Sequence, residues 1–217
     1  MSRIASFTFN PFAENTYIIY DDTLQCVIID PGCYTPEEKK ELVAFIEKNK
    51  LKPQYVLNTH CHIDHVLGNY FLCDKYNIPL VMHKEEVPVL KAVETYADTM
   101  GIVYEKSPDP EQFLDGGDTF SFGNTTFEIL YTPGHSPASI CFYNKREGYI
   151  ISGDVLFLDS IGRYDLPGGN LNTLMQSINT QLMTLDDIVT VYPGHGPETT
   201  VGRERKFNPF LREGIEY

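Results

Sequence analysis

The sequence of 217 residues lacks tryptophan and any apolar run near the ~20 residues needed to cross a bilayer. Its first ten residues also lack the basic-then-apolar order of a signal peptide, so we expect a cytoplasmic protein without membrane contacts. The five cysteines are an odd number without a CxxC pair, which argues against a disulfide framework and against a cysteine-type zinc site. Basic residues are few: 17 Lys and Arg stand against 30 Asp and Glu. The net charge of −13 disfavours nucleic acid as a partner.

The pattern of apolar and polar residues predicts short strands that alternate with helices. Thr35 and Glu38 form a capping box with Pro36 at the first helical position. Further helices are expected from about His65 to Tyr76, from Lys84 to about Met100 and from Leu171 to Met183. The expected strands are Ile4–Phe9, Thr16–Tyr20, Gln25–Asp30, Val56–Leu57, Pro79–Met82, Thr125–Tyr131, Ser139–Tyr143, Tyr149–Ser152 and Ile188–Tyr192. This order, with no linker or repeat, predicts one α/β domain over residues 1–217 in which helices cover packed sheets.

Three of the six histidines lie within six positions, in the segment His60-Cys61-His62-Ile63-Asp64-His65. The segment joins a strand to a helix, where a short stretch of backbone can direct several side chains at one or two metal ions. The competing interpretation is a polar helix cap with incidental histidines. Cys61, between two candidate ligands, is interpreted as a structural spacer.

Two more histidines follow Pro-Gly turns at strand ends, His135 in Thr132-Pro133-Gly134-His135 and His195 in Tyr192-Pro193-Gly194-His195. A single loop histidine is usually solvated, but two such turns beside the cluster favour metal binding. Asp154 also ends an apolar strand beside a glycine, although an isolated aspartate there would be an ordinary turn residue. The sixth histidine, His83, is interpreted as a hydrogen-bonding group at a strand end.

The order Asp30, His60 to His65, His135, Asp154 and His195 resembles the signature of the metallo-β-lactamase superfamily and covers nearly the whole chain. The resemblance implies a four-layer αββα sandwich. It further implies that one metal is held by His60, His62 and His135, the other by Asp64, His65 and His195, with Asp154 bridging the two. Asp30 would orient ligands without binding metal. Asp64 and Asp154 are thus the predicted catalytic carboxylates, and two divalent ions, zinc by default with iron or manganese as alternatives, would activate a bridging hydroxide.

Within that superfamily, Ser152 to Phe157 and Ser160 to Gly169 are similar to glyoxalase II-like hydrolases. This similarity implies hydrolysis of an acylated thiol such as S-lactoylglutathione. Full-length glyoxalase II enzymes carry a C-terminal helical domain, and the residues after His195 are too few to form one. Arg163 would bind a substrate carboxylate, or it would form a structural salt bridge with Asp165.

Other functions stay open at this point. Persulfide dioxygenases resemble the same subgroup, share the segment Gly162 to Asp165 and use a single iron. A lactonase or other ester hydrolase would need the same carbonyl chemistry with a different pocket. A metal-storage protein is disfavoured because the implied ligand set leaves room for water. The acidic pairs Glu37-Glu38 and Glu85-Glu86 are interpreted as favourable charges in first helical turns. The oligomeric state is not indicated.

Overall fold

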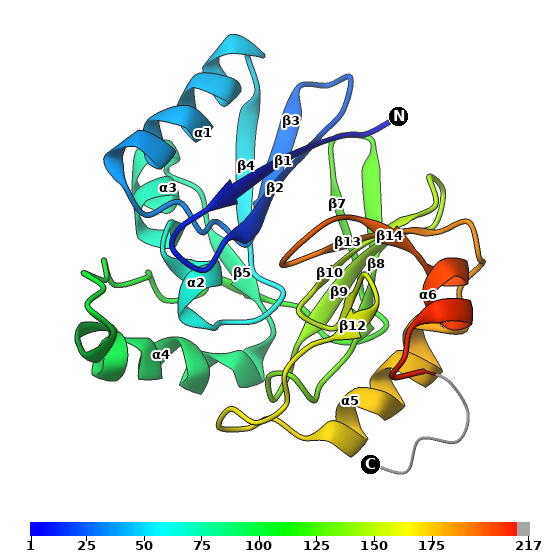
Figure 1. The fold of residues 1–217 in the computed structure, drawn as a ribbon. Coiled ribbons are helices and arrows are strands. Elements are labelled where there is room, and N and C mark those ends of the chain that lie inside the picture. Colours follow the sequence, from blue (N-terminus) through cyan, green and yellow to red (C-terminus); the bar gives the residue numbers. More distant parts are fainter. Residues whose placement is uncertain (212–217) are drawn as a thin grey trace.

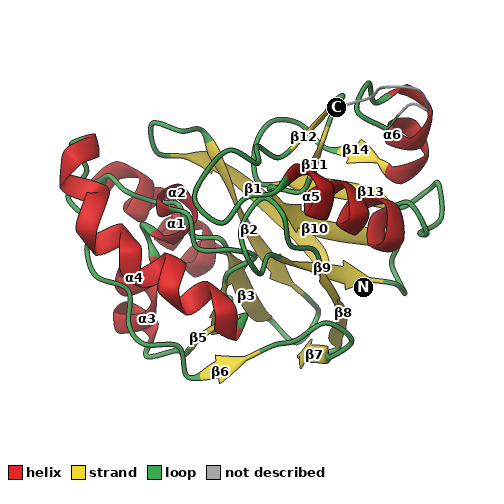
Figure 2. Cartoon of the chain, turned by 90° about the horizontal axis from the view of Figure 1, so that it is seen from below, coloured by secondary structure: helices red, strands yellow, loops and turns green. Residues whose placement is uncertain are grey.

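Residues 1–211 are described by a computed structural model, in which two six-stranded sheets pack face to face. Helices α1 to α4 cover the outer face of one sheet, and α5 and α6 lie outside the other (Figures 1 and 2). This is the predicted four-layer αββα sandwich, and α6 is the last helix among the described residues. None of the helices in the described range is long and apolar enough to cross a membrane.

The first sheet is built from the N-terminal half of the chain in the order β1-β2-β3-β4-β5-β6. The first three strands are antiparallel neighbours, whereas β4, β5 and β6 continue the sheet parallel to β3. Their bounds are β1 Arg3–Phe9, β2 Glu14–Tyr20, β3 Gln25–Ile29, β4 Lys52–Leu57, β5 Leu80–Met82 and β6 Gln112–Phe113.

The second sheet is built from the C-terminal half in the order β14-β13-β10-β9-β8-β7. Strands β7 to β10 form an antiparallel meander, and β13 adds to β10 in parallel. Their bounds are β7 Thr119–Phe122, β8 Thr125–Tyr131, β9 Ile140–Asn144, β10 Tyr149–Gly153, β13 Thr190–Pro193 and β14 Thr199–Thr200. A separate hairpin is formed by β11 Leu156–Phe157 and β12 Ser160–Ile161.

The helices occupy the outer layers. They are α1 Pro36–Lys48, α2 Ile63–Val66, α3 Asn69–Tyr76, α4 Val87–Tyr96, α5 Leu171–Ser177 and α6 Val201–Phe207. Short 3₁₀ turns, Lys84–Glu86 and Ala97–Met100, flank α4, and a π turn, Ile178–Leu182, extends α5. The predicted capping box is confirmed, because Thr35 accepts from the Glu38 amide and Glu38 accepts from the Thr35 amide.

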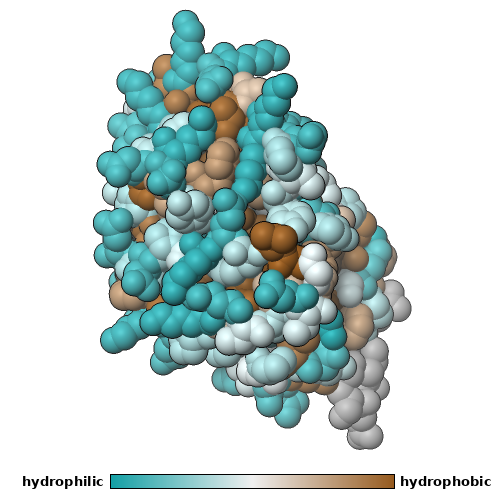
Figure 3. Space-filling model, turned by 90° about the vertical axis from the view of Figure 1, so that its left-hand side faces the viewer, coloured by the Kyte–Doolittle hydropathy of each residue, from teal (hydrophilic) through white to brown (hydrophobic). Residues whose placement is uncertain are grey.

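Three apolar layers separate the four layers of secondary structure. Alternate residues of one strand face different layers: Ile18 packs towards the helices, whereas Ile19 packs between the sheets. In the second sheet, Phe142 faces the layer between the sheets and Tyr143 faces α5. Strands buried on both faces explain why the central strands are apolar throughout rather than alternating with polar residues. Figure 3 shows the side covered by α1 and α4, where hydrophilic side chains cover most of the surface.

The predicted helix from His65 to Tyr76 is wrong as a single element, because it is split into α2 and α3 at Gly68. The Gly68 amide donates to the Pro31 carbonyl, and a Cβ at this position would lie 2.6 Å from the Cys33 Sγ. The chain therefore turns against the segment after β3, a tertiary contact that helical periodicity does not report. Strand β7 and helix α6 were not predicted from the sequence. The helix has only seven residues, and the cap that Thr200 provides to Arg203 marks its start.

Candidate metal centre

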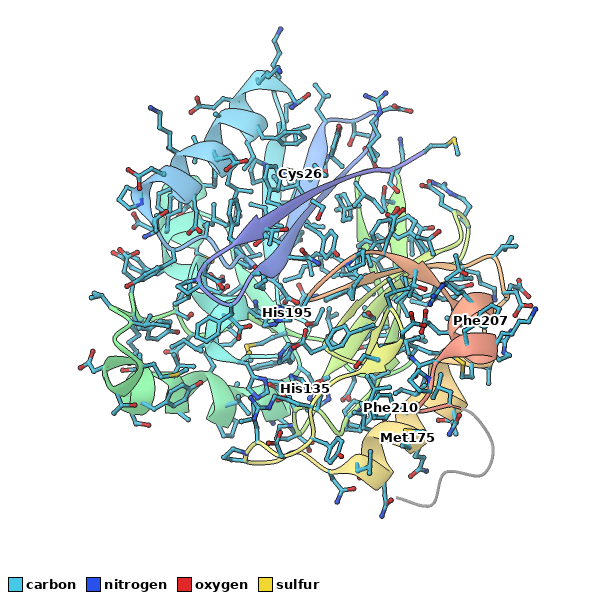
Figure 4. All side chains as sticks on the ribbon, in the orientation of Figure 1. Cys26, His135, Met175, His195, Phe207 and Phe210 are labelled. Carbon is cyan, nitrogen blue, oxygen red and sulfur yellow. The ribbon has the colours of Figure 1, made fainter. Side chains whose placement is uncertain are left out.

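The loops that carry the predicted ligands all leave the same edge of the sheets. Strands β3 and β4 are parallel, so the loop with Asp30 and the loop with His60 to His65 start at the same end. Strands β8 and β10 are both antiparallel to β9, and β13 is parallel to β10, so the loops with His135, Asp154 and His195 also start together. Figure 4 shows His135 and His195 near the middle of the molecule, between the two halves of the chain.

Three imidazoles converge on one point. The His135 Nε2 lies 2.8 Å from the His62 Nδ1 and 3.2 Å from the His60 Nε2. These three ligand atoms come from two loops that are more than seventy residues apart in the sequence. The predicted grouping of His60, His62 and His135 is therefore present as a geometric cluster.

In His135 and His60, hydrogen bonds made by the Nδ1 atoms determine that the Nε2 atoms carry the lone pairs. The His135 Nδ1 donates to the Arg163 carbonyl at 2.7 Å, so the His135 Nε2 is unprotonated in the neutral ring. The Thr59 hydroxyl gives its one proton to Asp30 at 2.5 Å and accepts from the His60 Nδ1 at 3.0 Å. Both Nε2 atoms then present lone pairs to each other at 3.2 Å, an arrangement that a cation between them would stabilise.

A second group lies beside the first. The His195 Nε2 is 3.1 Å from the Asp64 Oδ2, and the His65 Nε2 is 3.5 Å from the same oxygen. The outer nitrogens are again committed to protein oxygens: the His65 Nδ1 donates to Asp30 and the His195 Nδ1 to the Ala13 carbonyl, each at 3.2 Å. Their free nitrogens point at the Asp64 carboxylate, so Asp64, His65 and His195 form the second predicted ligand set.

Asp154 lies between the two groups. Its Oδ2 is 3.6 Å from the His135 Nε2 and 3.5 Å from the His195 Nε2, while its Oδ1 is 3.5 Å from the His65 Nε2. The Asp154 Oδ1 and the His65 Nε2 are buried without a hydrogen-bond partner among the described residues. A buried carboxylate oxygen left without a partner is costly unless a cation satisfies it, so the residues fit two metal ions that share Asp154.

The electrostatics of the cluster favour the ligating form of the first group. Burial, reinforced by the neighbouring imidazoles, lowers the pKa of His60 far below its usual range and that of His62 to about 3. Both rings are therefore neutral at pH 7 and have a lone pair to offer a metal.

The carboxylates are held in the ionised form. Burial alone would raise the pKa of Asp154 and of Asp64, but the adjacent His65 and His195 overcome it and lower both. Burial likewise opposes protonation of His65, yet the two carboxylates raise its pKa well above the usual value. The second group is thus a strongly anionic position where positive charge is stabilised.

Asp30 forms hydrogen bonds with His65 and with Thr59, the residue before His60. Its Oδ1 accepts from the Thr59 amide at 2.7 Å, and its Oδ2 accepts from the Thr59 hydroxyl and the His65 Nδ1. Asp30, His60 and His65 also lie close enough together to form a metal-ligand triad. Because the Asp30 oxygens are engaged by these donors, we assign Asp30 to the orientation of His65, as the family resemblance implies, and not to a third metal position.

The sequence left two roles open for Arg163, a contact with a substrate carboxylate and a salt bridge with Asp165. In the structure its side chain forms the salt bridge. Its Nε and one terminal nitrogen donate to the two Asp165 oxygens at 2.8 and 2.9 Å, and the pair is well exposed. The backbone of Arg163 contributes in a way that the sequence does not indicate, because its carbonyl accepts from His135. A substrate role for the guanidinium stays a prediction.

Residues outside the predicted set also contact the ligand loops. Glu86 lies in a first helical turn, as interpreted from the sequence, but it is also fully buried against both the His60 and the His135 loops. His83 is confirmed as a hydrogen-bonding group, since it accepts from the Glu85 amide and contacts Asp115. Cys61 is buried and burial raises its thiol pKa, which agrees with a structural spacer. No local sequence pattern distinguishes the buried Glu86 from its exposed neighbour Glu85, so the sequence could not identify this contact.

Comparisons with known proteins agree with this geometry. The profile of the metallo-beta-lactamase superfamily matches residues 9–195. The "Probable metallo-hydrolase YqgX" of Bacillus subtilis is 38% identical over 202 residues, which cover 93% of this chain and 93% of the relative. The "Hydroxyacylglutathione hydrolase GloC" of Haemophilus influenzae is 35% identical over 202 residues, which cover 92% and 93%.

Solved structures share the fold over nearly the whole chain. The BLEG-1 B3 metallo-beta-lactamase has a TM-score of 0.88 at 34% identity and covers 96% of this chain and 99% of its own. TTHA1623, solved in a di-iron-bound form, has a TM-score of 0.86 at 37% identity and covers 95% and 100%. ETHE1 from Myxococcus xanthus has a TM-score of 0.78 at 25% identity and covers 95% and 83%.

The substitution Asp30→Asn tests the orienting role. Asparagine tolerates the left-handed backbone at this position (φ 48°), but its amide nitrogen cannot accept a hydrogen bond, so the donors from Thr59 and His65 can no longer all be satisfied. We expect the affinity for one of two metal ions to fall by about 10- to 100-fold. Stepwise cobalt titration measures it, and unchanged affinities for both ions would show that Asp30 does not orient a ligand.

A side chain at Gly194 would collide with two of the proposed ligands. A Cβ at Gly194 would lie 2.1 Å from the Asp154 Oδ1 and 2.7 Å from the His65 Cε1. We therefore expect Gly194→Ala to lower metal affinity at least about tenfold by displacing these side chains. Gly101→Ala is the control, because it adds a methyl group in open space at a strained φ of 72°. It should lower the unfolding temperature and leave metal content unchanged; equal metal loss in both variants would contradict the steric cause.

Proposed function

The chain belongs to the metallo-β-lactamase superfamily, and from that premise we propose that it is a binuclear metal-dependent thioesterase acting on S-acylglutathione-type substrates such as S-lactoylglutathione. The observation that carries the proposal is the position of Asp154 between two separate ligand groups. The proposed ligands are His60, His62 and His135 for one ion and Asp64, His65 and His195 for the other, with Asp154 shared. Zinc is the first choice of metal, with iron and manganese as alternatives.

Two such ions, when bound, would lower the pKa of a shared water and polarise the substrate carbonyl. The residues prepare the site for this chemistry. The neutral rings of His60 and His62 offer lone pairs at pH 7, and the outer hydrogen bonds of His135 and His195 prevent these rings from turning away. The low pKa of Asp64 and Asp154 suits them better to ligation than to proton abstraction, so we assign their catalytic role to holding charge at the centre.

The acyl-thiol substrate is proposed on two supports. The GloC relative is named a hydroxyacylglutathione hydrolase and is similar over 92% of this chain. The segment from Ser160 to Gly169 runs beside the centre, since the Arg163 carbonyl contacts His135 and the Asp154 carbonyl lies 1.9 Å from where a Gly162 Cβ would be. A substrate held by this segment would place its reacting carbonyl near the shared carboxylate. We further propose that a small acyl thiol, and not a nucleic acid or a membrane, is the partner of a cytoplasmic enzyme with one catalytic domain.

A second candidate is a mononuclear iron persulfide dioxygenase. The observation that favours it is the self-contained first group, whose three imidazoles converge at 2.8 and 3.2 Å without any atom of the second group. Such an all-nitrogen set also suits iron. A relative solved in a di-iron-bound form supports iron as an occupant of this fold.

Metal dependence tests the main proposal. We expect the purified chain to contain about two divalent ions and to hydrolyse S-lactoylglutathione, with both properties reduced in Asp154→Ala because the shared ligand is lost. The rate should fall by about 100-fold or more. Metal analysis and release of free thiol are the measurements. Asp186→Ala, at an exposed aspartate remote from the ligand loops, should match the wild type.

The same preparation separates the alternatives. A single iron with no thioester turnover, together with oxygen uptake in the presence of glutathione persulfide, would replace the thioesterase with the dioxygenase. Turnover of a lactone or a β-lactam with none of the thioester would keep the metal-dependent hydrolysis and overturn the substrate class.

Arg163 tests the substrate contact. If its guanidinium binds a substrate carboxylate, Arg163→Ala should raise KM about tenfold and leave metal content unchanged, because only its backbone carbonyl contacts His135. Asp165→Asn removes the salt bridge but keeps the positive charge, so it should leave KM near the wild-type value. An equal rise of KM in both variants would assign Arg163 to loop structure alone.

A further inference from the structure

We infer that Glu86 is a positioning residue that joins the two loops carrying His60, His62 and His135 and thereby sets one of the two metal positions. The inference rests on the proposed two-metal function. It concerns a residue outside every predicted ligand set, in the 3₁₀ turn Lys84–Glu86 that follows β5.

Each of the two Glu86 oxygens is engaged by a ligand loop. The Oε2 accepts from the Cys61 amide at 2.9 Å. The Oε1 accepts from the Ser136 hydroxyl at 2.6 Å and from the Ala138 amide at 2.8 Å. Cys61 lies between two of the proposed ligands, and Ser136 directly follows the third. One carboxylate therefore contacts residues that adjoin all three histidines of the first group.

The contact matters because the two loops belong to different halves of the fold. The loop with Cys61 follows β4 of the first sheet, and the loop with Ser136 joins β8 to β9 of the second. The Thr59 carbonyl, which accepts from the Ile140 amide at 2.9 Å, provides one backbone link across this boundary. Glu86 adds three hydrogen bonds at the level of the ligands, where a small shift would separate nitrogens that lie 2.8 and 3.2 Å apart.

A carboxylate is the appropriate group for this position. Glu86 has no exposed surface, and burial raises its pKa. A buried carboxylate is stabilised only when donors engage both of its oxygens, as the two amides and the hydroxyl do. Glutamine has nearly the same shape but one oxygen, so its amide nitrogen would face either the Cys61 amide or the Ser136 and Ala138 donors.

The second metal position is anchored by a different residue, which makes a selective effect measurable. The loop with His195 is held by Asn15, whose Nδ2 donates to the carbonyls of Pro193 at 3.1 Å and Gly196 at 2.8 Å. Its backbone amide donates to the Gly194 carbonyl at 2.7 Å. Loss of Glu86 should thus loosen the first position and leave the second intact, and loss of the Asn15 side chain should do the reverse.

The test is stepwise cobalt titration of the apoprotein, followed by visible absorption and by competition with a chelator of known affinity. For Glu86→Gln we expect one of the two cobalt affinities to fall by about 10- to 100-fold and the other to stay within about threefold of the wild type. Adding Glu86→Gln to His62→Ala should cause little further loss, because both changes act on the same position. Adding it to His195→Ala should weaken both positions.

Glu204→Gln is the matched control. Glu204 is also fully buried and accepts from Thr199, Asn208 and the Asp159 amide, but it contacts none of the ligand loops. It should lower the unfolding temperature and leave both cobalt affinities unchanged. If Glu86→Gln does not fold, Ser136→Ala removes only one of the three hydrogen bonds and should weaken the same ion by about fivefold.

The outcomes separate this inference from the proposed function. Two unchanged cobalt affinities in Glu86→Gln and Ser136→Ala would overturn the positioning role, even if both variants are less stable. Equal weakening of both ions would overturn it as well, since a general loss of structure would then suffice. A wild-type chain that binds a single ion would contradict the two-metal function; loss of that ion's affinity in Glu86→Gln, with none in Glu204→Gln, would still support the positioning role, and its retention would overturn it.

Discussion

The metal centre depends on one constraint: every imidazole with a fixed outer hydrogen bond has only one nitrogen left to offer. His135 is committed to the Arg163 carbonyl, His195 to the Ala13 carbonyl, His60 to Thr59 and His65 to Asp30. These bonds select the tautomer and the direction of each ring before any ion arrives. Preorganisation of this kind explains why lone pairs face one another in a buried site, an arrangement that apolar packing alone would not stabilise.

The residues that accept or donate these histidine hydrogen bonds come from both halves of the chain, so the centre also links the two sheets. Asn15 and Tyr17 of β2 donate to the carbonyl of Pro193 at the end of β13, and Glu86 after β5 binds the loop between β8 and β9. The apolar layer between the sheets holds the halves together over their whole area. The polar contacts at the edge then fix the relative position of ligands to a fraction of an ångström, which area burial cannot do because it is not directional.

Much of this organisation follows from local sequence patterns. The capping box at Thr35, the apolar strands and the ligand segment from His60 to His65 can each be recognised within a few residues. The four-layer fold that the family resemblance implies is confirmed. The break at Gly68 and the short helix α6 escaped prediction because a contact with Pro31 causes the first and a seven-residue polar segment forms the second. The carboxylates Glu85 and Glu86 are neighbours with the same local pattern, yet one is exposed and the other fully buried.

The sequence alone determined the residue types and the order of the candidate ligands, because histidines and aspartates at strand ends are a property of the chain. It also determined the positions of most central strands through their apolar patterns. Only the tertiary structure decided which nitrogen of each imidazole faces the centre, that Arg163 pairs with Asp165, and that Glu86 lies between two ligand loops. The Arg163–Asp165 pair is local, and the structure selects it from the two roles that the sequence left open. The Glu86 contacts and the facing imidazole nitrogens depend on segments 25 to 75 residues apart, and the directions of such contacts exist only after the two sheets have packed.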